Sequence, residues 1–230
     1  MLQRKPKMSI QDPLKIDVTE RFDHLPHAPI VEAVIDIRAR AGDAWEEATV
    51  KARMQAQLAD YAYLDTQRVY EHEMKLDQGK PAEQTLRDLG CKGVRFKSTD
   101  ERHIVQFNRD GFVFSRLTPY ESWEQLHGEA MRLWQIYSGM AHPAQVQRLG
   151  LRFINRIELP PEEVRYEDYI QPAPEPPKHL ELPFHGFLHH DTLAVPGHAY
   201  ALNVIRTIQN VPNQPLAVVL DIDASRASVG

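Results

Sequence analysis

Three arginines, Arg148, Arg152 and Arg156, are the residues with the clearest capacity for chemistry, because they recur every fourth residue in the segment RLGLRFINRIEL at 148–159. The segment is predicted to form one long strand, so these side chains share a face with Glu158. Successive guanidinium groups then start about 13 Å apart, which suits an extended anionic partner better than one small phosphate. The spacing therefore predicts a cationic binding face.

The opposite face of this predicted strand is apolar, with one amide in it. Its members are Leu149, Leu151, Phe153, Asn155, Ile157 and Leu159. We group Asn155 with the arginines as a binding candidate, although a buried amide must be hydrogen-bonded and often fixes a turn or a helix end. The alternative for Arg152 and Arg156 is neutralisation within the fold, by Glu32 and Asp36 on a neighbouring strand.

A second possible chemistry is metal-dependent hydrolysis. Imidazole and carboxylate groups together bind zinc and similar ions, which lower the pKa of a bound water. Five histidines lie between residues 179 and 198. The candidate ligands are His185, His189, Asp191, Asp221 and Asp223. Against this reading, adjacent residues such as His189 and His190 point to opposite faces of a strand, and no HExxH spacing is present.

Other catalytic signatures are absent from the sequence. Neither phosphate-binding glycine motif, GxxxxGK[ST] or GxGxxG, occurs, and no GxSxG turn presents a nucleophile. The sequence therefore predicts no cofactor. It favours a non-catalytic binding protein over the metal-dependent hydrolase, which remains the alternative.

Two stretches of chain with a similar order of elements must position these residues. In the first, an alternating strand covers 30–40, and a helix with Asp43 as its N-cap covers 44–60. Extended segments follow at 66–76, 92–98, 102–109 and 111–118, with a hairpin tip at 108–111. An amphipathic helix covers 121–137. After 148–159, the second stretch has a short helix at 162–169, a proline-rich loop at 171–177, and strands near 184–194, 199–209 and 215–223.

This order predicts an α+β fold of two sequential units, each a strand, a helix and antiparallel strands. The units are expected to join at their first strands in one curved, mainly antiparallel sheet with helices on one face, similar in shape to the saddle of the TATA-binding-protein fold. We divide the chain into a mobile arm at 1–26, a first half at 27–146 and a second half at 147–230. The second half lacks a closing helix, so two explanations are open: the gene is truncated, or the uncovered sheet is covered in another way, for example by self-association.

Bulk composition limits the class of partner. The formal charge of −5 and the pI near 6.1 disfavour a nucleic acid as partner, because affinity for phosphate normally comes from clustered Lys and Arg. Cys91 is the only cysteine, and no apolar run approaches the roughly 20 residues that cross a bilayer. With no signal peptide at Met1, a cytoplasmic protein without membrane contact is expected.

Four segments together resemble a family that occurs sporadically in bacteria and archaea and has no established activity. They are PIVEAVIDIR at 29–38, GFVFSRLTPYESWEQL at 111–126, RLGLRFINRIELP at 148–160 and LDID at 220–223. The resemblance covers about half of the chain. It implies a bacterial cytoplasmic protein with two sheet-forming halves and no accepted catalytic residues. Family members continue past the last strand with further helix, whereas this sequence ends at Gly230.

The expected function is therefore binding of a macromolecular partner, most simply a protein, through a mixed-charge sheet surface centred on the three arginines. The sporadic occurrence of the resembling family fits a gene carried with defence or toxin-neutralising systems.

Overall fold

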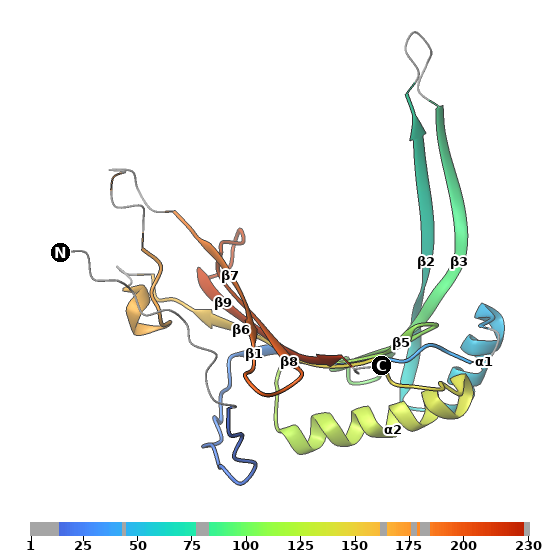
Figure 1. Cartoon of the computed structure of the whole chain (residues 1–230), viewed down its shortest axis with the longest axis horizontal. Coiled ribbons are helices and arrows are strands. Elements are labelled where there is room, and N and C mark those ends of the chain that lie inside the picture. The colour runs from blue at the N-terminus through green and yellow to red at the C-terminus, as the bar shows by residue number, and fades with distance from the viewer. Residues whose placement is uncertain are drawn as a thin grey trace. The chain divides into compact units, whose positions relative to one another are not determined.

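A computed structural model describes residues 14–42, 45–76, 83–161, 165–175, 179 and 185–227. The chain divides into two compact units. The central unit is Glu32–Leu149, and the terminal unit combines Met1–Val31 with Gly150–Gly230. The predicted α+β class is confirmed, because the described chain is mostly antiparallel sheet with helices (Figure 1). The joining of the units into one saddle-shaped sheet stays a prediction.

The central unit is a five-stranded sheet with two helices. Its elements are β1 (Ile30–Arg38), α1 (Glu47–Gln57), β2 (Tyr61–Lys75), β3 (Glu83–Ser98), β4 (His103–Asn108), β5 (Gly111–Leu117) and α2 (Trp123–Ala141). The strand order is β2-β3-β4-β5-β1, with antiparallel pairing at each step. Strands β2 to β5 thus lie side by side in chain order, and β1 pairs with β5.

Alternation of apolar side chains explains why this sheet carries its helices on one face. Ile35 pairs with Phe114, and Phe114 pairs with Val105, so all three side chains point to the same side. All three are buried, together with Leu126 and Leu133 of α2. The packing of α2 against the strands therefore follows from the period of two in the sheet and the period of 3.6 in the helix.

Local chemistry fixes the ends of α2 and the β4–β5 hairpin. Ser122 caps the helix by accepting a hydrogen bond from the backbone N–H of Gln125 at 3.3 Å, and His142 ends it in the left-handed conformation. The hairpin turns at Arg109 and Asp110, within the predicted tip. A side chain at Gly111 would meet the carbonyl oxygen of Ile37 at 2.4 Å, so only glycine allows this approach of β1.

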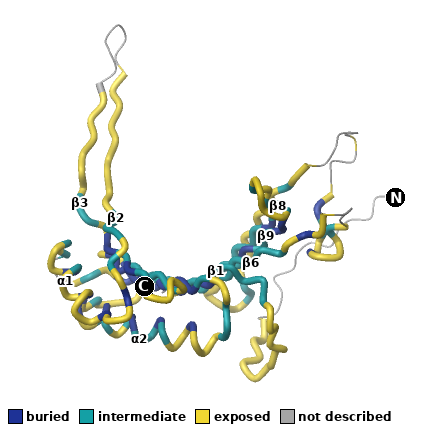
Figure 2. Tube along the Cα trace, turned by 180° about the vertical axis from the view of Figure 1, so that it is seen from behind, coloured by how far each residue is buried: buried dark blue, intermediate teal, exposed yellow. Residues whose placement is uncertain are grey.

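The β2–β3 hairpin is far longer than the sequence indicated. Strand β3 pairs with β4 only from Gly93 to Lys97, so the outer part of the hairpin, from Arg68 to Lys75, pairs with β3 alone. It projects from the rest of the central unit in Figure 1, and Figure 2 colours both of its strands as exposed. The sequence missed residues 83–91, whose mixed polar pattern has no apolar face.

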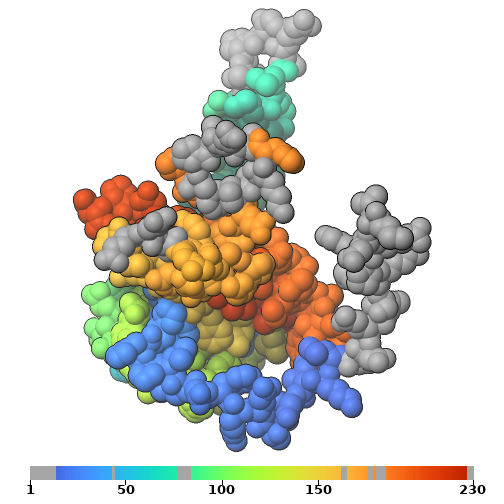
Figure 3. Space-filling model, turned by 90° about the vertical axis from the view of Figure 1, so that its left-hand side faces the viewer, coloured from blue at the N-terminus to red at the C-terminus, as the bar shows by residue number. Residues whose placement is uncertain are grey.

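The terminal unit is a four-stranded sheet in the order β6-β9-β8-β7. Its strands are β6 (Arg148–Glu158), β7 (Leu188–Ala194), β8 (Tyr200–Gln209) and β9 (Ala217–Ala227). A small core of Leu159, Ile170 and Val218 lies at one end, where the segment at 165–175 packs (Figure 3, golden atoms). That segment has one 3-10 turn, Tyr166–Asp168, in place of the predicted helix at 162–169, of which 162–164 lie outside the described residues.

Two further expectations meet the structure only in part. Helix α1 begins at Glu47, later than predicted, and the expected cap Asp43 lies outside the described residues. Within the expected N-terminal arm, the described residues start at Leu14, whose backbone N–H donates to the carbonyl oxygen of Pro196 at 2.9 Å. His198 makes a second contact with this residue, from Nε2 to the carbonyl oxygen of Leu14 at 2.7 Å. The start of the described arm is therefore tied to the β7–β8 connection.

Tyr137 provides a stability test of the central core. Its hydroxyl donates to the carbonyl oxygens of Ala39 at 2.9 Å and Asn108 at 3.0 Å, and its side chain is fully buried. We expect Tyr137→Phe to lower the free energy of unfolding by about 1–3 kcal/mol, because two buried carbonyls lose a donor. Denaturant unfolding followed by tryptophan fluorescence reports this unit alone, since Trp45, Trp123 and Trp134 are the only tryptophans. The exposed Tyr70→Phe is the matched control, with an expected change below about 0.5 kcal/mol.

Candidate functional site

The register of the terminal sheet sorts its side chains onto two unlike faces. His190 of β7 pairs with Ile205 of β8, which pairs with Asp221 of β9. Two residues further along the sheet, Asn203 pairs with Asp223. Because residues two apart share a face, these five side chains project to the same side. We call this side the charged face.

A shallow hollow of about 340 Å³ lies on the charged face. It is lined by Arg152, His190, Asn203, Ile205, Asp221 and Asp223. The lining residues come from all four strands of the sheet, so the hollow exists only when the whole ladder is in register. The hollow brings together Arg152, a predicted binding residue, and two predicted metal ligands, Asp221 and Asp223.

The ion pair between Arg152 and Asp221 sets the electrostatics of this hollow. Arg152 donates from Nε to Oδ1 of Asp221 at 2.8 Å, and its Nη2 contacts the other carboxylate oxygen. The side chain of Asp221 is only 9% exposed, whereas that of Arg152 is 46% exposed. The pair therefore buries its negative member and leaves the guanidinium partly exposed to solvent.

The other predicted binding residues do not join this hollow. Arg156 donates from Nε to the side-chain oxygen of Gln209 at 3.1 Å and from Nη2 to the carbonyl oxygen of Pro215 at 2.8 Å, and it pairs with Glu158. Asn155 donates from Nδ2 to the carbonyl oxygen of Leu220 at 3.0 Å. Both side chains thus tie β6 to the hairpin formed by β8 and β9.

Arg148 belongs to the central unit, where it pairs with Asp36. Glu32 and Asp36 are the predicted partners of Arg152 and Arg156. In the structure, Arg152 pairs with Asp221 and Arg156 pairs with Glu158. The reason is local pairing: the backbone N–H of Gln147 donates to the carbonyl oxygen of Arg38 at 2.7 Å, which brings the start of β6 beside the end of β1.

The predicted metal ligands are divided between the two faces. Asp221 and Asp223 line the hollow, whereas His189 and Asp191 alternate with His190 and project to the other side. Asp191 accepts a hydrogen bond from Nη2 of Arg206 at 2.7 Å, and His185 precedes β7 in an exposed position. Among the residues that the structure describes, no three His, Cys, Asp or Glu side chains gather as a metal site would require.

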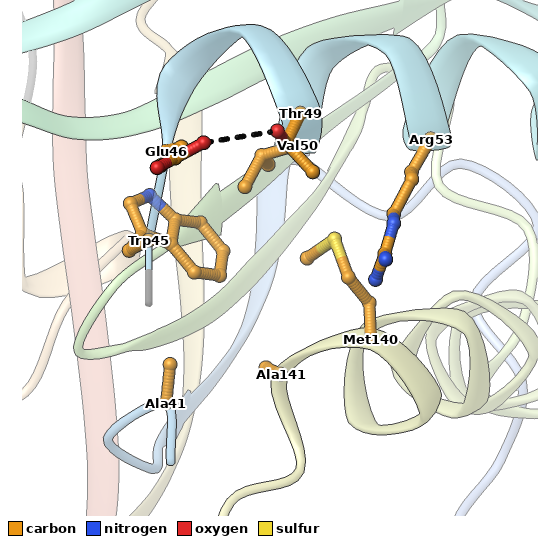
Figure 4. A pocket seen from close by; sticks show the side chains of 8 residues that line it. All are labelled: Ala41, Trp45, Glu46, Thr49, Val50, Arg53, Met140 and Ala141. Atoms are coloured by element: carbon orange, nitrogen blue, oxygen red, sulfur yellow. Dashed lines mark hydrogen bonds between the residues drawn. The ribbon is translucent and has the colours of Figure 1, made fainter. Parts of the chain in front are cut away.

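A second hollow, of about 290 Å³, lies in the central unit (Figure 4). It is lined by Ala41, Trp45, Glu46, Thr49, Val50, Arg53, Met140 and Ala141. The hydroxyl of Thr49 donates to Oε2 of Glu46 at 3.3 Å, and Figure 4 shows Arg53 reaching from α1 toward α2. Sequence patterns did not indicate this hollow, because it forms where the residues around the start of α1 meet the end of α2.

A polar cluster at one end of the central unit also escaped the sequence analysis. The buried Arg116 donates to Nε2 of His103 at 2.7 Å, to Glu121 at 2.9 Å and to the carbonyl oxygen of Pro119 at 3.2 Å. An arginine has donors only, so the imidazole must accept and be neutral. Burial, assisted by the positive charge of Arg116, lowers the pKa of His103 below 6.5. The predicted hairpin already implied this pairing, because its register places His103 opposite Arg116.

A carboxylate anchors the neighbouring part of this cluster. Tyr61 donates to Oε1 of Glu129 at 2.8 Å, and Arg132 donates to both oxygens of the same carboxylate at 2.7 and 2.8 Å. Burial opposes the ionisation of Glu129, but the hydrogen bonds from Arg132 and Tyr61 outweigh it and hold the pKa of Glu129 below its usual value. The cluster is therefore internally satisfied, which is typical of a structural network.

The depressed pKa of His103 makes the stability of the central unit depend on pH. The folded state binds a proton less readily than the unfolded state, so the stabilisation is complete above pH 6.5 and is lost as the pH falls toward the folded pKa. We expect the unfolding free energy to drop more between pH 7.5 and pH 5 in the wild type than in His103→Gln, which keeps an acceptor for Arg116 but does not titrate. Urea unfolding measures both slopes. The exposed His127→Gln is the control, and equal slopes in the wild type and His103→Gln would contradict the expectation.

Comparison of the chain with protein-family models, curated proteins and solved structures finds no match. Among the described helices, none is both long and apolar enough to cross a membrane. The geometry of the charged face therefore stands alone as the basis for a functional conclusion.

Proposed function

We propose that this chain is a non-catalytic binding protein that presents the charged face of its terminal unit to a protein partner. The observation that carries the proposal is the hollow across all four strands, in which the exposed guanidinium of Arg152 rests on the buried carboxylate of Asp221. An ion pair fixed on a sheet surface holds its charges in defined positions, which favours partners with complementary groups.

The chemistry of the hollow favours a protein over a nucleic acid. Its two carboxylates, Asp221 and Asp223, repel phosphate oxygens, whereas the side-chain amide of Asn203 can donate to a carbonyl or a carboxylate. A partner that places one polar side chain beside Asn203 and covers Ile205 fits this surface. The residues proposed for contact are Arg152, His190, Asn203 and Asp223. Arg156 is proposed at the edge of the surface, and no step of the proposal rests on Arg148.

A charge-swap variant tests this proposal without unfolding the sheet. Arg152→Glu alone would place two carboxylates together, so Asp221→Arg is added to restore an ion pair of reversed direction. We expect the double variant to unfold within a few degrees of the wild type and to lose at least about tenfold in capture of the natural partner from an extract. The readout is quantitative mass spectrometry of the captured proteins, followed by the affinity of the purified pair.

The matched control is the double variant Arg87→Glu with Glu71→Arg, which reverses an exposed ion pair between β2 and β3 of the central unit. Like the charge-swap variant, it leaves the net charge unchanged, so a general effect of reversing an ion pair would weaken its capture equally. Undiminished capture by the folded charge-swap variant would remove the charged face from the interface. The defence or toxin-neutralising context predicted from the sequence would gain support if the captured protein were a toxin or a nuclease.

The metal-dependent hydrolase is separated from this proposal by a direct measurement. Binding of an ion to the native state alone raises the unfolding temperature by mass action. We expect zinc, manganese and magnesium each to change the unfolding temperature of the chain by less than about 1 °C, because the candidate ligands are split between two faces. A larger rise that His190→Ala or Asp223→Ala abolishes would favour the hydrolase.

A further inference from the structure

Strand β7 is the outer strand of the terminal sheet, with β8 on its inner side. The backbone N–H of Val195, just past the end of β7, donates to the carbonyl oxygen of Tyr200 at 3.1 Å. Hydrogen-bonded and non-hydrogen-bonded pairs alternate along an antiparallel ladder, so the odd-numbered residues 189 to 193 also turn their backbone groups to β8. The even-numbered residues turn theirs outward. They are Leu188, His190, Thr192 and Ala194.

The outward backbone groups of these four residues form an open edge. All four residues are exposed, and no further strand lies beyond β7 among the described residues. Their N–H and C=O groups therefore have no strand partner in the part of the chain that the structure describes. A row of unpaired donors and acceptors of this kind is a template for another extended chain.

The outer strand of the central sheet, β2, is protected in the ways that sheet edges usually are. Its register with β3 is interrupted by three shifts, and it carries Arg68, Glu71, Glu73 and Lys75. Strand β7 instead pairs with β8 through seven consecutive residues without a shift, and it contains no Lys, Arg or Pro. Bulges, basic residues and prolines are the features that prevent a chain from adding to an edge. Strand β7 lacks all three.

We propose that the protein partner adds an extended segment to the outer edge of β7 as a further strand of the terminal sheet. This inference rests on the proposed function and names how the partner binds. His190 lines the hollow and lies on the charged face, so an added strand about 4.8 Å from β7 projects every second side chain onto that face. Backbone hydrogen bonds then supply affinity, and side chains beside the hollow supply specificity.

The side chains of β7 indicate the chemistry of the added segment. Leu188 is 68% exposed and Leu193 is 53% exposed, on opposite faces of the strand, which favours β-branched side chains beside both. Asp191 accepts a hydrogen bond from Arg206 through Oδ2, but its side chain is still 46% exposed. A Lys or Arg beside it would form a cross-strand ion pair. The expected segment is therefore apolar with a basic residue near its centre.

Asp191 also disfavours a second copy of β7 as the added strand. Two antiparallel copies overlap along all seven residues only when their central residues lie opposite each other, and the central residue of β7 is Asp191. Like charges directly opposite on neighbouring strands are unfavourable. A segment of a different protein avoids this repulsion.

A proline at the open edge tests the added strand. The N–H of Thr192 points away from β8, so Thr192→Pro removes an outward donor without removing a hydrogen bond of the β7–β8 ladder. The probe is the protein that the wild-type chain enriches most from the extract, expressed and purified. We expect Thr192→Pro to weaken its affinity at least about tenfold in calorimetric titration, at an unfolding temperature close to that of the wild type.

Thr192→Val is the matched control. Both variants lose the hydrogen bond from the hydroxyl of Thr192 to Oδ1 of Asn203 at 2.9 Å, but only valine keeps the backbone N–H. We expect Thr192→Val to bind within about threefold of the wild type. Equal loss in both variants would overturn the inference, because it would assign the effect to the side chain.

The remaining outcomes separate this inference from the proposed function. Wild-type affinity of a folded Thr192→Pro, together with loss of affinity in the charge-swap variant, would overturn the added strand alone. Undiminished affinity in both would overturn both proposals. A wild-type chain that dimerises without the partner at about 100 µM, while Thr192→Pro stays monomeric, would assign the edge to a second copy and also overturn the inference.

Amide hydrogen exchange on the unchanged chain removes any dependence on the folding of a variant. We expect the same purified partner to slow the exchange of the His190 and Thr192 amides at least about tenfold, because the added strand would accept hydrogen bonds from them. The amide of Leu193 faces β8 and is the internal control, protected in the free chain as well. Equal exchange of His190 and Thr192 in the free and bound chain would overturn the added strand even if a complex forms.

Discussion

The register of the β7–β8–β9 ladder is the constraint on which the terminal unit depends. Strand side chains alternate with a period of two, so a slip of one residue in β8 would exchange Val204 with Ile205 and Asn203 with Leu202. The hollow would lose the amide of Asn203. The opposite face of the sheet, which carries Leu202 and Val204, would gain polar groups. The ion pair of Arg152 with Asp221 and the ion pair of Arg206 with Asp191 lie on opposite faces of the sheet. The pair of Arg206 with Asp191 penalises a slip of β8 against β7, and the pair of Arg152 with Asp221 penalises a slip of β9 against β6, because each slip would leave a charge without its partner.

The two units differ in how far their apolar side chains are buried. In the central unit, Tyr137 and Leu133 of α2 complete a core of packed phenylalanines, and the hydroxyl of Tyr137 contacts two backbone carbonyls at the ends of β1 and β4. The terminal unit buries Val218 and Leu159 at one end and leaves the remaining apolar side chains partly in water. Completing the burial of a half-exposed leucine or isoleucine contributes about 1 kcal/mol.

The arrangement of side chains on the charged face favours a binding role over a catalytic one. The carboxylate of Asp221 is engaged by Arg152, and the remaining ligand-type side chains are divided by strand alternation, so the hollow does not gather the groups that activate water. The His103 and Glu129 cluster of the central unit has perturbed pKa values as well, but each of its groups is satisfied by a neighbour. Perturbation of pKa by an internal network is compatible with a purely structural role.

The sequence by itself determined the elements and the two-faced strands, because periods of two and 3.6 are local properties that each segment carries. The α2 helix, the β4–β5 hairpin and the extended form of β6 all follow from such patterns. Only the tertiary structure decided which charges meet. The face of Arg152 could be read from its spacing, but the choice of Asp221 over Asp36 depends on which strand lies beside β6, and that is set by long-range packing. The convergence of His190, Asn203 and Asp223 on one hollow has the same origin, since pairing register joins residues that are distant in sequence.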